Sequence, residues 1–320
     1  MKRTVLRILT AIQLTRLTIA FGAISEIWFV LLLMWSEQPQ PAEGLAHGMS
    51  LAPALLAGAV VATGLSAYGA SFNDVLDVRH DMVFSPERPI PAGRIKVGQA
   101  AVVTVGALLL AILAASAFRG EALRVTLVAA AAILFYNAAG KYIPAIGIPT
   151  IGLIHALHMF IPDLGLGFTL PIWLVFSHTM LIALAVHVLE EKRPKITRRS
   201  AAAIAVAWLS WSGVILTLGL YRDSGFHFVP MGFLAPIAAI IGFLIVARWK
   251  TANVPRLVAA EKLKRYGAMW QCLYGASWFL AIGHLVAAMW LAIVAVVGFS
   301  AMTLLKELTG ITNKPVRYRA

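Results

Sequence analysis

The sequence has few charged residues and a single cysteine. Charged residues make up 13% of the 320-residue chain, against about 25% in ordinary soluble domains. Apolar residues make up 60% of the chain, and its mean hydropathy is +0.82. This composition excludes a soluble single domain. Because Cys272 is the only cysteine, an intrachain disulfide and every zinc or redox site built from cysteine pairs are also excluded.

Long apolar runs predict an all-α polytopic membrane protein that forms one domain over residues 1–320. Each run approaches the ~20 residues that an α-helix needs to cross a bilayer, and short polar segments separate the runs. We predict about nine transmembrane helices, at 14–35, 51–72, 98–118, 122–140, 145–168, 170–189, 200–221, 229–247 and 271–305. The last run is long for one crossing, and Gly275, Gly283 and Gly298 favour a bend in it. The pattern is therefore compatible with about eight to ten crossings.

Lysine and arginine are distributed unevenly between the two sides of the predicted membrane. Most of the 27 basic residues fall on the side of the N-terminus when the loops are assigned alternately. Cytoplasmic loops collect such residues, so we expect an integral protein of a bacterial inner membrane with its N-terminus in the cytoplasm. The basic C-terminal tail is the exception, because nine crossings place it on the other side. The net charge of +13 fits attraction to anionic membrane lipids and predicts no nucleic-acid partner.

Acidic residues are scarce, so their placement is informative. Asp74, Asp77 and Asp81 follow one another closely at the end of the second predicted span. On a helix, Asn73, Asp77 and Asp81 share one face, and Asp74 lies beside them. Like charges at this spacing weaken a helix unless cations bind them. Mg²⁺ prefers carboxylates together with water and phosphate oxygens, so this face predicts a holder for a metal-complexed phosphorylated substrate. A solvated helix end capped by Asp81 is the alternative.

The next segment, Pro86 to Ile95, places Arg88 and Arg94 beside the acidic helix. Its prolines favour an extended turn, and Gly93 permits a tight bend. A guanidinium group suits phosphate oxygens, which aspartates bind only through a metal. The two arginines are therefore candidates for phosphate contacts, although arginines that merely anchor the cytoplasmic side of the membrane would show the same pattern.

Further ionisable residues occur in a second loop and inside the predicted spans. Glu190 and Glu191 lie between the sixth and seventh spans, on the same side as the first acidic segment. Glu26 lies inside the first span, where an ionised carboxylate needs a partner. His155 and His158 share one face of the fifth span. Glu26, His155 and His158 are candidates for lining a ligand pocket, or they are satisfied by packing between helices.

The first acidic segment resembles that of the UbiA superfamily of intramembrane prenyltransferases. The family motif Asn-Asp-x-x-Asp-x-x-x-Asp is matched in full at 73–81. The run Arg-Pro-Ile-Pro-Ala-Gly-Arg-Ile at 88–95 is similar to that of the chlorophyll synthase and digeranylgeranylglyceryl phosphate synthase branches. Other positions similar to the family are Arg16, Tyr136, Asn137 in place of a serine, Lys141, Gly147 and Gly152. The resemblance implies a UbiA-like fold, with the helices arranged around a central cavity.

The second family motif is only partly present. Met180, Ala183 and His187 stand where the family has aspartate, tyrosine and aspartate, and only Glu190 and Glu191 keep carboxylates. This departure puts a second magnesium ion and full catalysis in question. His187 is a candidate metal ligand when neutral and a candidate phosphate donor when charged, or a histidine at a helix end without either role.

The resemblance implies a Mg²⁺-dependent prenyltransferase that ionises an allylic prenyl diphosphate and transfers the prenyl group to a lipophilic acceptor. It implies catalytic roles for Asp74, Asp77, Asp81 and Lys141, metal ligation by the three aspartates and Glu191, and substrate binding by Asn73, Arg88, Arg94, Tyr136, His187, Glu190, Glu191 and Lys192. The alternatives are a catalytically altered lipid-binding protein, a membrane transporter and, within the family, a terpene cyclase. The acceptor, the prenyl chain length and the oligomeric state stay open.

Overall fold

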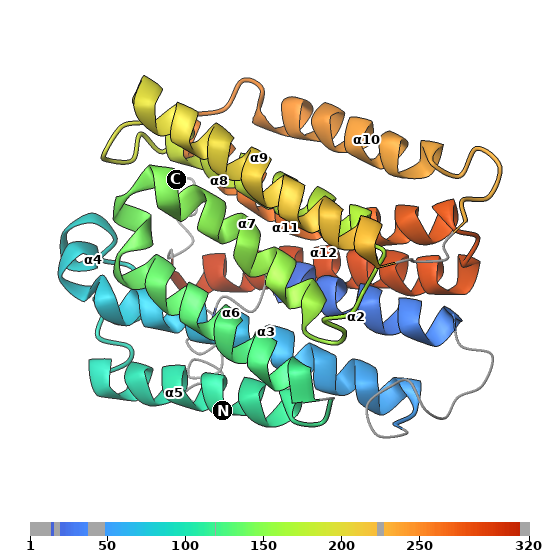
Figure 1. Ribbon diagram of the computed structural model, residues 1–320. Helices are drawn as coiled ribbons and strands as arrows, with labels where there is room; N and C mark the ends of the chain where they lie inside the picture. Colours follow the sequence, from blue (N-terminus) through green and yellow to red (C-terminus); the bar gives the residue numbers. More distant parts are fainter. Residues whose placement is uncertain (1–13, 16–19, 38–48, 119, 223–226, 314–320) are drawn as a thin grey trace.

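The computed structural model describes residues 14–15, 20–37, 49–118, 120–222 and 227–313, and every regular element in these ranges is helical (Figure 1). The elements are α2 (Ala20–Glu37), α3 (Leu51–Leu76), α4 (Val78–Phe84), α5 (Val97–Ala115), α6 (Gly120–Ala138), the 3₁₀ helix η3 (Gly140–Tyr142), α7 (Pro144–Phe160), α8 (Leu170–Leu189), α9 (Arg198–Tyr221), α10 (Leu234–Thr251), α11 (Arg256–Ala281) and α12 (Leu285–Asn313).

Eight of the described helices are long and apolar enough to cross a membrane, namely α2, α3, α5, α6, α8, α9, α10 and α12. The apolar helix α7 has 17 residues, fewer than the predicted run 145–168. It ends at Phe160, and Pro162, two residues later, has no N–H group with which to continue the helical hydrogen bonds. The prediction of an all-α membrane architecture is confirmed.

The predicted last span at 271–305 is wrong, because two helices share this sequence. α11 ends at Ala281, and Gly283 follows with φ of +85°, a conformation that glycine adopts without steric cost. The N–H of His284 donates to the carbonyl of Phe279 at 2.9 Å, and that of Gly283 donates to Leu280 at 3.3 Å. This pair of bonds is the Schellman motif that ends many helices. The apolar run thus contains a helix terminus, which hydropathy alone does not reveal.

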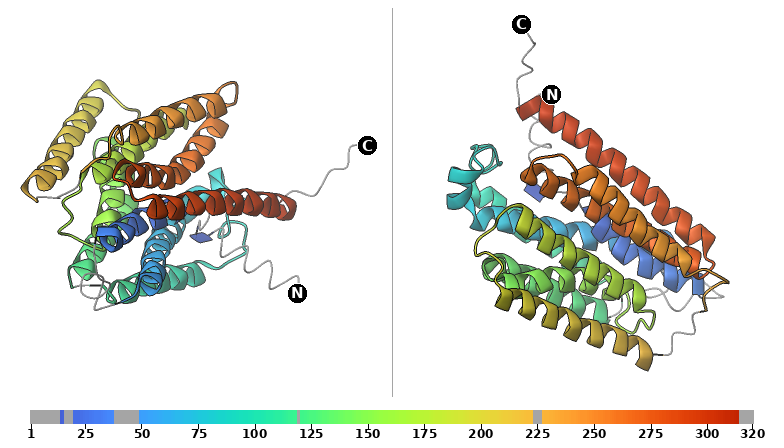
Figure 2. Two further views of the ribbon diagram at one scale, coloured as in Figure 1. Left: turned by 90° about the vertical axis from the view of Figure 1, so that its right-hand side faces the viewer. Right: turned by 90° about the horizontal axis from the view of Figure 1, so that it is seen from above.

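The division at Gly283 reverses the direction of the last helix. α12 packs antiparallel to α11, since Leu291 lies against Gly275 and Met269 lies against Gly298. α12 therefore runs toward the end of the bundle at which α11 begins, where α11 carries several basic residues. In Figure 2 it extends beyond the rest of the bundle at that end. The basic residues of the tail from 314 onward lie outside the described residues.

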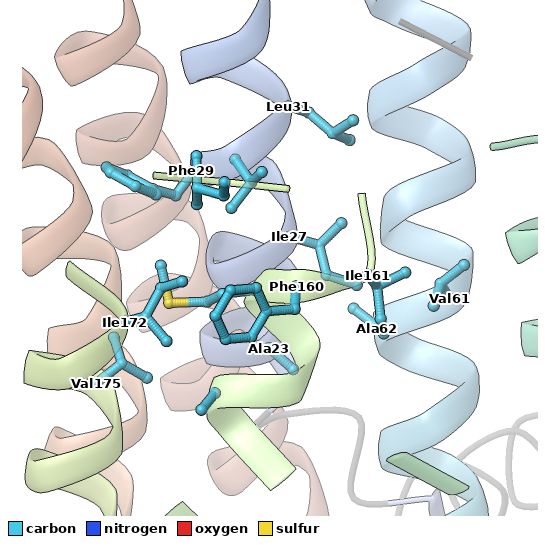
Figure 3. Close-up of a cluster of buried hydrophobic side chains, with 14 of the residues drawn as sticks. Ala23, Ile27, Phe29, Leu31, Val61, Ala62, Phe160, Ile161, Ile172 and Val175 are labelled. Atoms are coloured by element: carbon cyan, nitrogen blue, oxygen red, sulfur yellow. The ribbon is translucent and has the colours of Figure 1, made fainter. Parts of the chain in front are cut away.

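The core of the bundle lies among α2, α3, α7 and α8. Figure 3 shows part of it, where Ile27 on α2, Val61 on α3, Phe160 on α7 and Ile172 on α8 converge. Close helix contacts depend on small residues here, as is common in membranes. A Cβ atom on Gly152 would lie 2.8 Å from the carbonyl oxygen of Phe176, so this position lets α7 and α8 approach closely. By contrast, α9 and α10 bury few residues within the protein.

Both acidic loops lie at one end of this bundle. The segment between α3 and α5, which includes α4, and the loop between α8 and α9 are both on the left in Figure 1. The fold therefore places at the same end of the bundle two polar segments that are more than a hundred residues apart in sequence, as the alternating loop assignment predicts.

Candidate functional site

The first acidic segment forms an almost continuous helix across the junction of α3 and α4. The N–H of Asp77 donates to the carbonyl of Asn73 at 2.9 Å, and the N–H of Asp81 donates to Asp77 at 2.8 Å. Helical spacing is therefore kept although Asp77 itself, with φ −89° and ψ 8°, separates the two helices. Asp74 and Asp81 are buried and Asp77 is partly exposed. The three aspartates therefore lie on one nearly continuous helical segment, and their joint binding of a metal stays a prediction.

Arg88 bridges the two buried carboxylates. Its Nη1 atom lies 2.6 Å from Oδ2 of Asp81 and 3.4 Å from Oδ1 of Asp74. The guanidinium side chain is 33% exposed, whereas both aspartate side chains are at most 5% exposed. Arg88 thus compensates buried negative charge and keeps an accessible edge. A metal ion bound to these carboxylates would have to displace Arg88 or share them with it. The Arg88 contact therefore affects how strongly a metal binds here.

The loop from Pro86 to Ile95 is held by backbone hydrogen bonds and by one apolar anchor. The N–H groups of Arg94 and Ile95 both donate to the carbonyl of Pro89, and Gly93 has φ of +70°. Ile90 is buried in a small apolar cluster with Leu14 and Ala100. Nη2 of Arg94 donates to the carbonyl of Glu87 at 2.6 Å, so this side chain helps to shape the loop.

Lys141 contacts the same acidic segment from a helix that lies beyond α6 in the sequence. Its Nζ atom lies 2.6 Å from Oδ1 of Asp77 and 3.2 Å from Oδ1 of Asn73. The lysine comes from η3, directly after α6, and its side chain is 14% exposed. A Cβ atom on Gly147 would lie 2.3 Å from the carbonyl oxygen of Gly140, so the start of α7 touches the backbone of η3 and fixes its position.

Asn137 ties the end of α6 to α3. Its Nδ2 atom donates to the carbonyl of Gly69 at 3.3 Å and to that of Ile133 at 3.0 Å. This inter-helix contact keeps α6, and with it Lys141, beside the acidic segment. Tyr136 is half-buried and packs against the main apolar core. The predicted segment of Tyr136, Asn137 and Lys141 is thus joined to the aspartate motif, while Arg16 lies outside the described residues.

The oxygen donors of this segment fit magnesium by their chemistry. Three carboxylates and one amide oxygen are hard ligands of the kind that Mg²⁺ prefers. One imidazole is also near, since Nδ1 of His80 lies 3.8 Å from Oδ1 of Asp81. Arg88 and Lys141 add positive charge on two sides. Such a mixture of acids that attract a metal and bases that attract phosphate suits a metal-complexed anion better than a free metal ion.

The second acidic loop has a different arrangement, because bases from α11 reach its carboxylates. Glu190 contacts Nζ of Lys264 at 2.5 Å and Nζ of Lys192 at 3.0 Å. Burial raises the pKa of Glu190, but hydrogen bonds from both lysines and their charges outweigh burial and hold the pKa below its ordinary value. Glu190 is therefore ionised at neutral pH and already paired with two cations.

Glu191 and His187 form the C-terminal cap of α8. Glu191 has φ of +51°, and the N–H of Lys192 donates to the carbonyl of His187 at 3.1 Å, as in a Schellman motif. The carboxylate of Glu191 contacts Arg256. His187 is buried, and its Nε2 lies 3.0 Å from the carbonyl oxygen of Pro194. The structure thus assigns a loop-shaping contact to His187, and its predicted ligand role stays a prediction.

Sequence reasoning missed the contribution of α11. Arg256 and Lys264 contact acids that precede them by 65 and 74 residues. Their spacing of eight residues puts them on one side of a helix, which is a usable signal. The run was read as a cytoplasmic loop, however, because its charged residues lower its hydropathy below that of a span.

Comparisons with known proteins agree with this architecture. Residues 26–267 match the model of the UbiA prenyltransferase family. A solved structure of a digeranylgeranylglyceryl phosphate synthase is similar, with a TM-score of 0.57 and 17% identity over 88% of this chain and 99% of that chain. A UbiA homologue from Archaeoglobus fulgidus bound to DMAPP and Mg²⁺ has a TM-score of 0.44 and 12% identity over 92% of this chain and 98% of that chain. An apo UbiA homologue from Aeropyrum pernix K1 has a TM-score of 0.45 and 17% identity over 87% of this chain and 98% of that chain. No curated protein matches significantly.

Proposed function

The chain belongs to the UbiA prenyltransferase family, and on this premise we propose that it transfers a prenyl group from an allylic prenyl diphosphate to a lipophilic acceptor in the presence of Mg²⁺. It is an integral membrane protein, and eight apolar helices within the described ranges are long enough to cross a bilayer. One observation carries the proposal. The aspartate segment, Arg88 and Lys141 converge at one end of the bundle and combine metal-binding with phosphate-binding chemistry.

The aspartate segment is the proposed holder of the donor diphosphate. Asp74, Asp77 and Asp81 provide the carboxylates for Mg²⁺, and Asn73 provides an amide oxygen. When bound, Mg²⁺ supplies positive charge that stabilises the diphosphate as a leaving group. Arg88 is the phosphate-facing cation on one side, since its guanidinium group is partly exposed.

Lys141 is the proposed cation on the other side of the diphosphate. Its ammonium group already lies against Asp77 and Asn73, so it needs only a small shift to share its protons with a phosphate oxygen. In the reaction, the allylic C–O bond breaks and its electron pair stays on the diphosphate. The acceptor nucleophile then forms a bond to the allylic carbon and releases a proton to a base. Positive groups placed where the leaving oxygen gains charge lower the barrier.

The second loop is the proposed outer wall of the same site. Glu191 is a candidate metal ligand, while Glu190, Lys192, His187, Arg94 and Tyr136 are candidate substrate contacts. The dense basic charge beside Glu190 supports phosphate contact by lysine more than a second carboxylate-bound metal. We place these loops in the cytoplasm of a bacterial cell, with the prenyl tail extending into the bundle, in the central cavity that the family fold implies.

The altered second loop makes a catalytically reduced, lipid-binding protein the second candidate. Its carboxylates contact Arg256, Lys192 and Lys264 instead of being left to a metal. Such a protein binds the prenyl diphosphate with Mg²⁺ but does not turn it over. A terpene cyclase consumes the donor without an acceptor. A transporter neither consumes the donor nor forms a new product, so a single assay separates these functions.

The test measures diphosphate release by the purified full-length protein in nanodiscs. Dimethylallyl, geranyl and geranylgeranyl diphosphates are supplied with a native lipid extract, with and without Mg²⁺, to the parent and to Asp77→Asn. Asp163→Asn is the matched control, because Asp163 lies in the loop after α7 and accepts a hydrogen bond from the N–H of Gly165. We expect Mg²⁺-dependent release that falls about 100-fold or more in Asp77→Asn and stays unchanged in the control.

Each outcome has a distinct meaning. A product mass equal to the acceptor plus the prenyl group minus one hydrogen supports transfer, and a cyclised hydrocarbon or alcohol supports a cyclase. Mg²⁺-dependent binding of a prenyl diphosphate without release supports the lipid-binding candidate. Release that is equal in the parent and in Asp77→Asn overturns the assigned role of the aspartate segment.

A further inference from the structure

A second cluster of ionisable side chains lies deep inside the helical bundle, far from the acidic loops. Oε1 of Glu26 on α2 lies 2.6 Å from Nδ1 of His155 on α7, and Oε2 lies 3.0 Å from Nδ1 of His158. The two histidines are three residues apart, so both rings project from the same face of α7 toward one carboxylate. The expectation that Glu26 needs a partner and that the histidines share a face is therefore realised in one cluster.

The position of this cluster separates it from the diphosphate site. His155 lies 11 residues into α7 from Pro144, which corresponds to about 17 Å along the helix axis. Lys141 lies just before that helix start. A depth of about 17 Å is more than half of a hydrocarbon core of about 30 Å. The cluster is thus too deep for the carbon atom that carries the diphosphate, and the proposed prenyl transfer does not explain it.

Burial of these ionisable side chains carries a desolvation cost that their partners must offset. The side chains of Glu26 and His158 are 1% and 4% exposed, whereas that of His155 is 27% exposed. Ionisable residues at this depth are expensive and mark functional sites more often than structural ones. In addition, Nε2 of His158 is a buried nitrogen with no hydrogen-bond partner among the described residues. A group outside the polypeptide that brings an oxygen atom would satisfy it.

We propose that Glu26, His155 and His158 bind a transition-metal ion of the zinc type. One carboxylate oxygen and one nitrogen from each ring lie within 4.8 Å of one another. Two imidazoles and a carboxylate are the ligand set of many zinc and non-haem iron sites, whereas Mg²⁺ prefers oxygen alone. A metal at this position would bind Nδ1 of each ring in place of the hydrogen bonds to Glu26. Each neutral imidazole then carries its single proton on Nε2.

The geometry requires only a small expansion. With metal–ligand bonds of about 2.1 Å, neighbouring ligand atoms in a tetrahedral site are about 3.4 Å apart. The two oxygen-to-nitrogen distances are 2.6 and 3.0 Å, so each opens by less than about 1 Å. These two distances involve different oxygens of Glu26, and one ligand atom from each of the three residues lies within 4.8 Å of the others.

Charge balance and access define the fourth position. A divalent metal with one carboxylate and two neutral imidazoles carries a single positive charge, which the membrane interior disfavours. A hydroxide or an anionic oxygen of a lipophilic ligand at the fourth position cancels it. Three protein ligands with one open position are typical of zinc sites that bind or activate small ligands. Partly exposed His155 places that opening on its own side of the cluster.

Metal content is the direct test, and it does not depend on prenyl transfer. The full-length protein in nanodiscs is stripped with chelator, loaded with Zn²⁺ or Co²⁺, desalted and analysed by elemental mass spectrometry. We expect one metal ion per chain and a Co²⁺ absorption spectrum typical of nitrogen ligands in a four-coordinate site. Glu26→Gln and His158→Asn each lower the Zn²⁺ affinity at least tenfold. Asp163→Asn, in the loop after α7, leaves the affinity unchanged, and excess Mg²⁺ in the loading buffer keeps Zn²⁺ and Co²⁺ from the aspartate segment.

A matched control uses another histidine–carboxylate contact, between His284 and Glu37, whose atoms are 2.7 Å apart at the far end of the bundle. Glu37→Gln should not change the metal content. His155→Cys keeps a metal ligand at the accessible position, so it should retain Co²⁺ and add a sulfur-to-cobalt charge-transfer band. That band cannot arise from a misfolded variant that has lost the site.

Two results would overturn the proposal. The first is a parent protein that holds no Zn²⁺ or Co²⁺ above the level of Glu26→Gln, which leaves a hydrogen-bonded carboxylate and histidine pair. The second is a bound metal whose affinity and spectrum are the same in the parent and in properly folded His155→Cys. Neither result affects the diphosphate assay, so the two proposals fail independently.

Discussion

Replacement of Arg88 by methionine should lower the stability of the protein and make the stability of the variant depend on Mg²⁺. Arg88 lies 2.6 Å from Asp81 and 3.4 Å from Asp74, and both carboxylates are buried. Removal of one partner from a buried ion pair costs about 3–5 kcal/mol. Because the arginine side chain is 33% exposed, solvent screens part of this interaction, and we expect a loss of about 2–3 kcal/mol. Methionine retains much of the aliphatic volume, so the loss reports mainly on charge.

Mg²⁺ should offset this loss in the variant. The two carboxylates no longer contact Arg88, so they bind a divalent cation more strongly than in the parent. A ligand at 100 times its dissociation constant stabilises the folded state by about 2.7 kcal/mol, which is close to the expected loss. The Tm of Arg88→Met should therefore be about 4–6 °C below that of the parent without Mg²⁺ and approach it in excess Mg²⁺.

The single cysteine provides the assay. Cys272 is fully buried, so a thiol-reactive fluorophore reports its exposure as the protein unfolds on heating. Arg124→Met is the matched control, since Arg124 contacts Glu121 at 2.8 Å in an exposed pair. Such a pair contributes less than about 1 kcal/mol. Equal Tm values for both variants, or an equal effect of Mg²⁺ on the parent and on Arg88→Met, would refute the reasoning.

Three further predictions concern the lysine, a helix contact and the second loop. Lys141→Met should weaken Mg²⁺-dependent binding of a non-hydrolysable geranyl diphosphate analogue at least tenfold, as measured by calorimetry, and unchanged affinity would contradict its phosphate-facing role. Gly147→Ala should lower the Tm, because the new Cβ would lie 2.3 Å from a backbone oxygen of Gly140 and such overpacking costs about 1–3 kcal/mol. Gly98→Ala, where nothing lies within 4 Å, should not lower it. Because the pKa of Glu190 is lowered from its ordinary value of 4.5, its stabilising contribution is present above pH 4.5 and is lost as the pH falls through the lowered pKa. The Tm difference between the parent and Glu190→Gln should accordingly be largest at neutral pH and shrink in acid, and a difference that grows on acidification would contradict the assigned contacts.

Local patterns were enough to predict most of the first acidic site. Asn73, Asp77 and Asp81 are four residues apart, and the hydrogen bonds that bring them together connect residues at that same spacing. Arg88 is only seven residues from Asp81. Such short separations leave the chain little freedom, so a helical reading of the sequence already implies which side chains can meet.

The second loop and the last helices show where local patterns fail. Glu190 contacts Lys264, which is 74 residues away in the sequence, and no local pattern in either segment predicts this pairing. The turn at Gly283 divides an apolar run that is continuous in hydropathy, because a helix terminus depends on one residue's φ and on two hydrogen bonds. Hydropathy measures transfer into lipid, and it contains no information about chain reversal within an apolar segment.

The sequence by itself determined that this protein lies in a membrane, that it is helical and that Asp74, Asp77 and Asp81 gather in one short segment. These properties follow from composition, from the length of apolar runs and from i, i+4 spacing, all of which act on neighbouring residues. Only the tertiary structure decided that Lys141 joins Asp77, that α11 supplies the bases for the second loop, and that Glu26 meets two histidines within the bundle. Each of these contacts depends on which helix faces lie against each other, and that choice is made by the packing of the whole bundle.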